Sequence, residues 1–396
     1  MTAAVLTVSA LALSACNAVT ASDGTSSTAE SSDGATTATP AVDMSVNVAK
    51  AKKVAVDTVV KAHASDGSLR NVQVFYGKKP SKDTRVDGTM SKDNSGWTAD
   101  DLLEPGKTYH VVTRGENADG ESRSTTTRFS TEDLTLDQQT FPSVFPLQGQ
   151  TVGVAIPIIV RFDLPVHRKA AVEKRLSVTS DADVPGSWSW VSDTEVRYRP
   201  KKFWPGGTKV HVSADVNSVS VGNGIYGQES RDVKFTIGKS QVSTVDVTGH
   251  TLTVRSDGKV LRTLPATTGK PGFETRAGTK VIMEKYLSKR MDAATTGVST
   301  SSPDYYNIGN VQYAMRVTNS GEFIHAAPWS VGSQGSANVS HGCVGLSTAN
   351  AQWLYSITQI GDPVKFIHSS RPLEQGNGWT DWDESYQDFK DGSALS

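Results

Sequence analysis

The sequence predicts a mainly β protein of several domains, in which two β-sandwiches precede a third, hairpin-rich β domain with one main helix. Three observations support this class. The chain has 396 residues, which is more than one hydrophobic core usually holds. Thr, Ser, Val and Gly are abundant while long helical apolar stretches are scarce, and this composition favours strands. Short apolar runs separated by turn signals recur along most of the chain.

The charged residues nearly cancel, with 40 Lys and Arg against 41 Asp and Glu. The protein therefore has no overall field that would draw it to nucleic acid or to an anionic membrane surface. We expect no nucleic-acid partner.

The first residues predict export. Residues 5–16 form an apolar run that is too short to span a membrane and that ends in small residues directly before Cys16. The end of this run, residues 13–16, resembles the bacterial lipobox, in which the leader is cleaved before the cysteine and that cysteine receives lipid. We therefore expect residues 1–16 to be a lipoprotein signal peptide and Cys16 to be the lipidation site that anchors the protein to the membrane. The alternative is that Cys16 is an ordinary small residue in a leader cleaved elsewhere.

Residues 17–44 predict a disordered linker. They are rich in Ala, Ser, Thr, Gly and Asp and contain no aromatic residue, so they have little surface to bury. Such a tether would hold the folded domains away from an anchored lipid.

Residues 45–132 predict a β-sandwich. Alternating runs at 72–76 and 109–112 predict strands, and turn signals stand at Asp87-Gly88, Pro105-Gly106 and Asp119-Gly120. Short strands spaced by such turns are typical of immunoglobulin-like sandwiches.

Residues 133–238 predict a second copy of this architecture. Its strands are expected at 154–162, 194–198, 210–212 and 233–237. The segment 105–111 also recurs loosely as 205–212, about one sandwich length, or roughly 100 residues, further along. Neither copy holds a plausible acid, base or metal cluster, so we expect two immunoglobulin-like domains that act as spacers.

Residues 239–370 predict a third, β-rich domain. Its first hairpin is indicated by strands at 251–254 and 260–265 around the turn signal Asp257-Gly258, and further strands are expected at 279–283, 314–318, 322–325 and 363–367. The one main helix is expected at 348–358, with Ser347 as its N-cap and Gly361 beyond its C-terminus. The C-terminal segment, residues 371–396, carries four aromatic residues, and we expect it to pack on the third domain.

Chemistry is predicted by Cys343 and by the two histidines His325 and His341. A thiol is a useful nucleophile as a thiolate, and a nearby imidazole can accept its proton and hold the resulting ion pair. Gly342 lets the backbone turn sharply, so that amide N–H groups can point at an oxygen that becomes negative. The pattern predicts acyl transfer, with Cys343 as nucleophile and His325 as general base.

Two other interpretations of these residues stay open. A lone buried cysteine is usually inert, and a single histidine is more often a surface or core residue than a catalytic one. Metal binding would use the same residue types, but no acidic or Cys-x-x-Cys partner stands near them. Metal binding is therefore weakly supported by these residues, and the family resemblance described next implies that no metal or organic cofactor is needed.

The spacing around these residues is similar to that of a known family. His325, fourteen residues, then Ser340-His341-Gly342-Cys343 resembles the signature of the L,D-transpeptidase catalytic domain, also called the YkuD domain. Residues 326–332, the run 350–353 and the tryptophan-containing tail are similar to mycobacterial and other actinobacterial members, which also carry tandem immunoglobulin-like domains. The resemblance covers most of the mature chain, and its core motif is highly specific.

The resemblance implies a role for each matching residue. Cys343 matches the nucleophile and His325 the histidine that activates it, while the backbone carbonyl of Ala326 would orient the imidazole. Gly342 and His341, with Cys343, match the region that forms the oxyanion site. The positions that line the substrate cleft in relatives match Met283, Tyr306, Ser320, Gly321, Ala327, Trp329 and Gly345, for which ordinary packing is the alternative.

Gly345 departs from the family's pattern. Relatives usually carry Asn or Arg two residues after the nucleophile, where a polar side chain would bond to nearby backbone or to substrate. Glycine removes that side chain. We expect activity to persist, with a reduced rate, an altered donor preference or a looser site.

The resemblance implies an enzyme that cross-links peptidoglycan between the third residues of stem peptides, through a thioester on its cysteine. The partners would be a tetrapeptide donor and an amine acceptor, and carbapenem-type β-lactams would be covalent inhibitors. Together with the leader, this places the protein at the outer face of the cytoplasmic membrane, within the cell wall. An L,D-carboxypeptidase and a non-catalytic, wall-binding surface lipoprotein are the alternatives. Papain-like wall peptidases are disfavoured because their cysteine precedes their histidine.

Overall fold

The computed structural model describes residues 39–396. The expected signal peptide, the lipidation site Cys16 and most of the expected linker lie outside the described residues. Val42 is already buried and strand β1 (Asp43–Val46) follows it, so the first domain starts inside the segment predicted as linker. None of the helices within residues 39–396 is long and apolar enough to cross a membrane.

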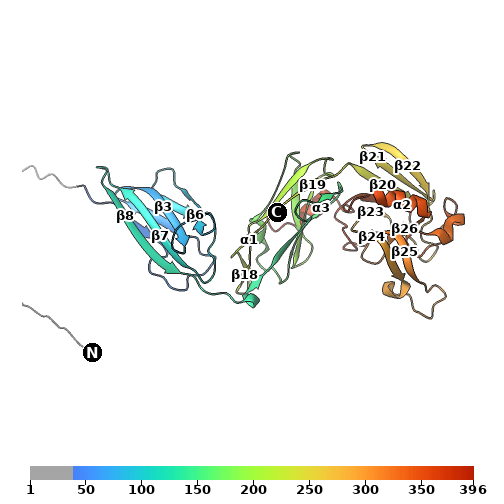
Figure 1. Ribbon diagram of the computed structural model, residues 1–396, viewed down its shortest axis with the longest axis horizontal. Helices are drawn as coiled ribbons and strands as arrows, with labels where there is room; N and C mark the ends of the chain where they lie inside the picture. The colour runs from blue at the N-terminus through green and yellow to red at the C-terminus, as the bar shows by residue number, and fades with distance from the viewer. Residues whose placement is uncertain (1–38) are drawn as a thin grey trace, which may run out of the picture. The chain divides into compact units, whose positions relative to one another are not determined.

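The first domain is a sandwich of two four-stranded sheets (Figure 1). One sheet has the order β1-β2-β6-β5, with β2 (Lys61–Ser65), β6 (Gly96–Ala99) and β5 (Gly88–Met90). The other has the order β4-β3-β7-β8, with β4 (Arg85–Val86), β3 (Ser68–Tyr76), β7 (Thr108–Glu116) and β8 (Ser122–Ser130). Alternation along β7 buries Tyr109 and Val111 in the core between the sheets. The predicted sandwich is confirmed.

The second domain is also a sandwich. Its main sheets are β10-β12-β15-β14, formed by β10 (Pro142–Phe145), β12 (Ile158–Phe162), β15 (Glu195–Pro200) and β14 (Gly186–Trp190), and β11-β19-β16-β13, formed by β11 (Thr151–Val152), β19 (Arg231–Ile237), β16 (Lys209–Ala214) and β13 (Leu176–Ser180). A small sheet and a short helix complete it, formed by β17 (Ser220–Gly222), β18 (Ile225–Gly227), β9 (Gln139–Thr140) and α1 (Lys169–Glu173). Val160, Val212 and Trp204 belong to the single core that both main sheets share.

The apolar run 154–162 forms a strand only from Ile158 onward, so the prediction of one continuous strand was wrong. Gly153 and Ala155 instead donate their backbone N–H groups to carbonyls at Ile360 and Gly361 of the third domain, at 2.7 and 2.9 Å. Val154 and Ile156 are nevertheless buried in the core of the second domain. Apolar periodicity does not distinguish a buried strand from a buried connection of this kind.

The third domain contains two sheets (Figure 1). The five-stranded sheet β22-β21-β20-β28-β23 consists of β22 (Lys259–Pro265), β21 (Thr251–Ser256), β20 (Gln241–Asp246), β28 (Pro363–Ile367) and β23 (Gly278–Val281). The four-stranded sheet β24-β25-β26-β27 consists of β24 (Glu284–Asp292), β25 (Asn307–Arg316), β26 (Phe323–Ala326) and β27 (Val344–Leu346). The predicted hairpin turn is present, because Asp257 and Gly258 both have positive φ between β21 and β22.

Helix α2 (Thr348–Ile357) supports the four-stranded sheet. Ser347 caps it as predicted, accepting a hydrogen bond from the backbone N–H of Asn350 at 3.3 Å. The helix packs on β25 and β26, as Figure 1 shows, and its Leu354 joins Ile324 and Leu346 in one buried core. The strand that carries His325 therefore rests on this core.

The C-terminal segment contacts two domains, whereas the sequence predicts the third domain alone. On the third domain, Asn377 accepts a hydrogen bond from the backbone N–H of Ser320 at 2.9 Å. On the second domain, the buried guanidinium of Arg199 faces the rings of Trp382, Tyr386 and Phe389, with 4.7, 5.3 and 4.8 Å to the ring centres. Tyr386 and Phe389 lie on a short helix, α3 (Tyr386–Asp391), that the sequence does not predict.

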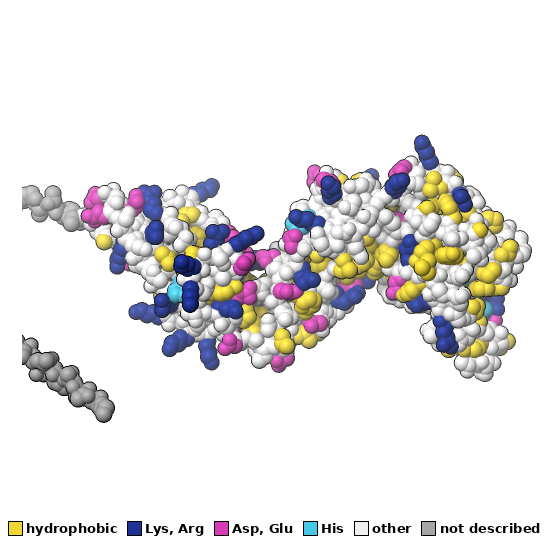
Figure 2. Space-filling view, in the orientation of Figure 1, with side chains coloured by type: hydrophobic (Ala, Val, Ile, Leu, Met, Phe, Trp, Pro, Cys, Tyr) yellow, Lys and Arg dark blue, Asp and Glu magenta, His cyan; other side chains and the backbone are white. Residues whose placement is uncertain are grey.

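Hydrophobic side chains form visible patches over the third domain on the face drawn in Figure 2. The exposed apolar residues of this domain include Val260 and Leu261 on the edge strand β22 and Trp329 near the candidate site. Isolated exposed apolar residues are ordinary on a protein surface, but Trp329 is large and borders a cavity.

Candidate active site

Cys343 ends a tightly held loop that leads into β27. Ser340 Oγ accepts a hydrogen bond from the Gly342 N–H at 3.1 Å and donates one to the Cys343 carbonyl at 2.6 Å. Gly342 has a φ of 119°, in the left-handed region that favours glycine. Thr275 Oγ1 donates to the Gly342 carbonyl at 2.7 Å, so the loop is also fixed from outside. This arrangement places the cysteine at a defined position.

His325 lies on β26, beside the strand that follows the cysteine. β26 and β27 pair in parallel, with His325 opposite Gly345. The imidazole Nδ1 lies 2.8 Å from the Ala326 carbonyl oxygen. Because a carbonyl can only accept, Nδ1 carries the proton in the neutral ring and Nε2 is left as a proton acceptor. The expected orienting role of Ala326 is thus matched by this contact.

The Cys343 thiol is buried, with 7 % of the residue exposed, and Sγ donates to the Gly321 carbonyl at 3.7 Å. Burial raises the pKa of this thiol to about 12, and the Phe323 backbone N–H opposes that shift. Burial also lowers the pKa of His325 below its ordinary 6.5. The free protein therefore holds a neutral thiol and a neutral imidazole instead of the ion pair that the sequence predicts. A base must take the thiol proton during attack.

His341 lies next to the nucleophile, between aromatic rings. Its ring centre is 4.6 Å from that of Phe273 and 5.1 Å from that of Tyr306. Nε2 lies 3.6 Å from a carboxylate oxygen of Asp304. Burial, followed by the charge of Lys270, lowers the pKa of His341. His341 is thus neutral at neutral pH.

Cys343 and His325 line the same cavity, of about 320 Å³, which we call the thiol cavity. Five of the other residues predicted for the site also line it, namely His341, Tyr306, Ala327, Trp329 and Gly345. The sequence does not predict the other seven lining residues, which are Thr267, Met291, Ile308, Val311, Ser330, Val339 and Ser340. The lining is largely apolar, as in most small-molecule sites.

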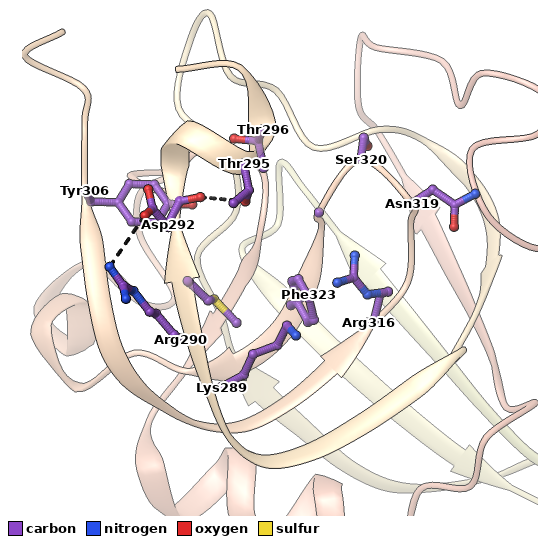
Figure 3. Close-up of a pocket in the computed structure, with 12 residues that line it drawn as sticks. Lys289, Arg290, Asp292, Thr295, Thr296, Tyr306, Arg316, Asn319, Ser320 and Phe323 are labelled. Atoms are coloured by element: carbon purple, nitrogen blue, oxygen red, sulfur yellow. Dashed lines mark hydrogen bonds and ion pairs between the residues drawn. The ribbon is translucent and has the colours of Figure 1, made fainter. Parts of the chain in front are cut away.

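A second cavity of about 550 Å³, which we call the side cavity, is drawn in Figure 3, and its lining includes Gly321, whose carbonyl accepts from Sγ. Its lining contains the predicted residues Tyr306, Ser320 and Gly321, and it shares Tyr306 and Met291 with the thiol cavity. Three cations and one carboxylate also line it, namely Lys289, Arg290, Arg316 and Asp292. Arg316 is paired with Glu284 at 2.6 Å and Arg290 with Asp292 at 3.8 Å, so these three cations face two carboxylates and the positive charge left to attract an anionic group is small.

Met283 lines neither of these two cavities, which differs from the prediction. It is buried, and its backbone N–H donates to the Arg316 carbonyl at 2.9 Å. Its side chain packs near Gly378 of the C-terminal segment. Met291, eight positions further along, occupies the shared wall of the cavities instead. Nothing in the residues around these two methionines indicates which of them faces a cavity.

Gly345 fits a position without room for a side chain. It pairs with Thr267 through two backbone hydrogen bonds, of 2.9 and 3.0 Å. A Cβ added there would lie 2.9 Å from Thr267 Cγ2 and 3.0 Å from Ala327 Cβ. Neighbouring side chains therefore fill the space beside this glycine, and the expected effects on rate, donor preference and tightness of the site stay predictions.

Among residues 39–396, no group of three or more His, Cys, Asp or Glu side chains is placed to hold a metal ion. Within the same range, Cys343 is a free cysteine. The chemistry that these residues can support is acyl transfer to a thiol, with a neutral imidazole as base.

Comparison with known proteins agrees with this geometry. Residues 240–366 match the family described as L,D-transpeptidase catalytic domain, and residues 51–220 match the one described as bacterial Ig domain. The chain is 33 % identical over 345 residues to L,D-transpeptidase 2 of Mycobacterium tuberculosis, which covers 87 % of this chain and 82 % of that protein. It is 35 % identical over 320 residues to L,D-transpeptidase 5 of the same species, covering 78 % of this chain and 68 % of the relative.

A solved structure, that of LD transpeptidase LdtMt1 in complex with imipenem, is also similar. The match has a TM-score of 0.51 at 38 % identity and covers 58 % of this chain and 99 % of that one. The similarity extends over a domain pair as well as over the catalytic motif.

Proposed function

The chain belongs to the L,D-transpeptidase family, and on that premise we propose that it cross-links peptidoglycan stem peptides through a thioester on Cys343. The donor is a tetrapeptide stem, and the acceptor is an amine on the third residue of a second stem. The observation that carries the proposal is the position of the thiol. Cys343 lines the thiol cavity, and its Sγ contacts the carbonyl of Gly321, which lines the side cavity. Transfer between two stems needs space for both beside one sulfur.

In the first step Sγ attacks the carbonyl carbon of the donor's third residue while His325 Nε2 accepts the thiol proton. The C–N bond to the terminal D-Ala then breaks, and the imidazolium returns the proton to the departing amine. A thioester on Cys343 remains. The neutral imidazole of the free protein supports this role, since a protonated ring could not accept.

In the second step the acceptor amine attacks the thioester carbonyl, and His325 takes a proton from the nitrogen as the new C–N bond forms. The C–S bond breaks, and the imidazolium returns that proton to the leaving thiolate. The weakly cationic lining of the side cavity suits a stem end that carries a carboxylate. The apolar thiol cavity, with Trp329 at its edge, suits the aliphatic part of the other stem.

Mass spectrometry of products from disaccharide-tetrapeptide substrate tests the proposal. Wild-type protein should release D-Ala and form cross-linked dimer, and Cys343→Ala protein should do neither. Release of D-Ala without dimer would show an L,D-carboxypeptidase instead. Absence of both products from correctly folded wild-type protein would refute the enzymatic proposal and favour a wall-binding surface protein. A Cys343→Ala gene that restores the wall of a deletion strain as well as the wild-type gene does would point the same way.

We also propose that carbapenem-type β-lactams acylate Cys343. The solved relative in complex with imipenem supports this, as does the position of Cys343 in the lining of an apolar cavity. Intact mass after incubation with meropenem should show one adduct on the wild-type protein and none on Cys343→Ala.

The proposed location is the outer face of the cytoplasmic membrane, with the chain anchored by lipid on Cys16. The apolar leader and the residues at 13–16 support it. Metabolic labelling with a fatty acid should mark the wild-type protein and not Cys16→Ala. The two sandwiches would then act as spacers that carry the catalytic domain into the wall.

A further inference from the structure

We propose that the buried ion cluster of Arg276, Lys280 and Glu322 positions the nucleophile. It does so by holding residues 321–323, which face Sγ, in place relative to the loop that carries Cys343. The inference deepens the proposed function and rests on it. Neither the motif nor the cavity linings include these three residues.

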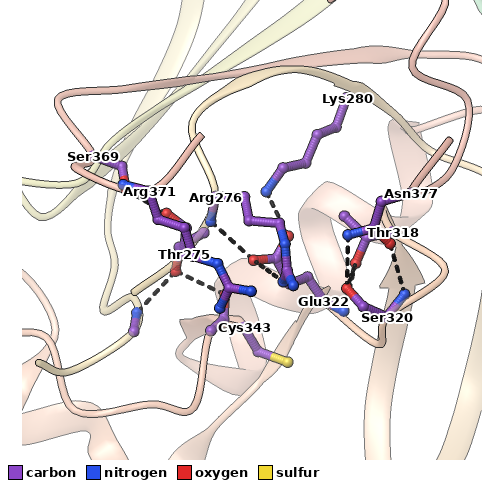
Figure 4. A network of polar contacts seen from close by, with 12 residues as sticks. Thr275, Arg276, Lys280, Thr318, Ser320, Glu322, Cys343, Ser369, Arg371 and Asn377 are labelled. Carbon is purple, nitrogen blue, oxygen red and sulfur yellow. Dashed lines mark hydrogen bonds and ion pairs between the residues drawn. The ribbon is translucent and has the colours of Figure 1, made fainter. Parts of the chain in front are cut away.

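The three side chains form one cluster centred on Glu322, drawn in Figure 4. Lys280 Nζ lies 2.6 Å from Glu322 Oε2, and the Arg276 backbone N–H donates to Glu322 Oε1 at 2.9 Å. The Arg276 guanidinium lies 3.3 Å from the same Oε1. The Lys280 side chain is 1 % exposed and the Glu322 side chain 5 %. Lys280 lies on β23 and Glu322 directly precedes β26, so the cluster joins the two sheets of the catalytic domain.

Glu322 stands between the two residues that contact the sulfur. The Gly321 carbonyl accepts from Sγ at 3.7 Å, and the Phe323 backbone N–H stabilises the thiolate. The backbone of Glu322 is held as well, because its N–H donates to Thr318 Oγ1 at 2.9 Å and its carbonyl accepts from the Val317 N–H at 3.0 Å. Any shift of Glu322 would therefore move both groups that face the thiol.

The opposite side of the thiol is tied to the same point. Thr275, which directly precedes Arg276, donates its hydroxyl to the Gly342 carbonyl at 2.7 Å. Two neighbouring residues thus hold Gly342 through one hydrogen bond and Glu322 through another (Figure 4). The segment 275–276 therefore links the loop that carries Cys343 to the segment that faces its sulfur.

The charges of the cluster largely oppose one another at the sulfur. Glu322 raises the pKa of Cys343 and Lys280 lowers it. An ion pair this deeply buried also contributes little net stability, since apolar replacements of similar size are often as stable. Geometry is therefore the contribution that distinguishes the cluster from an ordinary buried pair.

Two matched double variants test the inference. Glu322→Leu/Lys280→Met removes both charges and the oxygen that accepts from the Arg276 N–H, while Arg276 keeps its ion pair with Glu374. Glu322→Gln/Lys280→Met removes the same charges but keeps an accepting oxygen. A remote control, Arg197→Met/Asp381→Leu, removes a buried ion pair between the second domain and the C-terminal segment.

The expected result is a split between these variants in the rate of Cys343 acylation by meropenem, followed by intact mass. The Leu/Met variant should be about 10- to 100-fold slower than wild type, the loss expected when reacting groups are displaced by a fraction of an ångström to 1 Å. The Gln/Met variant should stay within a few-fold of the wild-type rate, and the remote control should react at the wild-type rate. Near-UV circular dichroism should show native packing in all of them.

Acylation of the Leu/Met variant at the wild-type rate would overturn the inference, and so would an equal loss in both double variants, which would assign the effect to charge. If the Leu/Met variant loses its near-UV signal, Thr275→Val is used as the test variant in its place, because this change removes only the hydroxyl that holds Gly342. A wild-type rate for Thr275→Val would then overturn the inference. Wild-type protein that meropenem does not acylate would count against the proposed function, and alkylation of Cys343 by iodoacetamide would still rank the variants.

Discussion

Adding a single methyl group at Gly345 should destabilise the catalytic domain. Gly345 lies in the middle of β27, with Thr267 paired to it on one side and Ala327 close by. A Cβ would lie 2.9 Å from Thr267 Cγ2 and 3.0 Å from Ala327 Cβ, both well inside ordinary van der Waals contact. Neither neighbour can turn away, because alanine has no side-chain rotamer and Thr267 Oγ1 is bound to the Ala337 carbonyl at 2.7 Å. The backbone must move instead.

The magnitude follows from two opposing effects. Overpacking a well-packed core costs about 1–3 kcal/mol. Replacing glycine by alanine reduces the entropy of the unfolded chain, which stabilises the folded state by about 0.4–1 kcal/mol. The net loss for Gly345→Ala should be about 1–2 kcal/mol of unfolding free energy. Because His325 lies opposite Gly345 in the strand pairing, acylation by meropenem should slow as well.

Urea denaturation followed by tryptophan fluorescence measures this loss. Gly309→Ala is the matched control, since Gly309 is also a strand glycine of this sheet and a Cβ there would meet nothing within 4 Å. The control should be neutral or slightly more stable than wild type. A Gly345→Ala protein with the wild-type urea midpoint would refute the packing argument, and the glycine would then need another explanation.

Three further changes give distinct outcomes. His325→Gln should slow acylation by meropenem about 10²- to 10⁴-fold. Because burial lowers the pKa of His325, the unfolded chain binds a proton at this histidine before the folded protein does as the pH falls below 6.5, so the wild-type protein should lose stability there and the variant should lose less. Urea midpoints at pH 5 and 7.5 would check this difference. Burial raises the pKa of Asp362 from 3.8 to about 7, so between these pH values the folded protein holds a proton that the unfolded chain has lost, and stability falls as the pH rises from 3.8 to about 7. Asp362→Asn should therefore be more stable than wild type at pH 8 by about 1–3 kcal/mol. An unchanged urea midpoint at pH 8 would contradict this. Trp382→Ala should lower the free energy of unfolding by about 2–4 kcal/mol in thermal denaturation, because Trp382 packs on Phe203 and donates to the Ala155 carbonyl at 2.8 Å. Trp329 is 57 % exposed, so Trp329→Ala should barely change the melting temperature but should weaken meropenem binding.

Much of the fold follows from local patterns. The turn at Asp257-Gly258, the cap at Ser347 and the strand at β28 are where the sequence predicts them, because each depends on neighbouring residues alone. The pattern failed at residues 154–157 and in the C-terminal segment. At 154–157 the side chains join the core of their own domain while the backbone bonds to the third domain, and the C-terminal segment packs on the second domain; periodicity along one segment cannot report such contacts.

The candidate site divides in the same way. Cys343, His325 and Gly342 could be predicted, because they lie in short stretches of sequence with characteristic residue types and spacing. Met291 and the ion cluster were missed, because Glu322 lies more than forty residues from Arg276 and Lys280 and meets them only when the two sheets of the domain assemble.

The type of chemistry, a thiol with a histidine base, was therefore decided by residue identity along the chain. The protonation state, the volume beside Gly345 and the two cavities around the sulfur were decided by tertiary packing. The physical reason is that pKa shifts, close contacts and cavities depend on which atoms exclude water from a group. Those atoms come from strands and loops that lie far apart in the sequence.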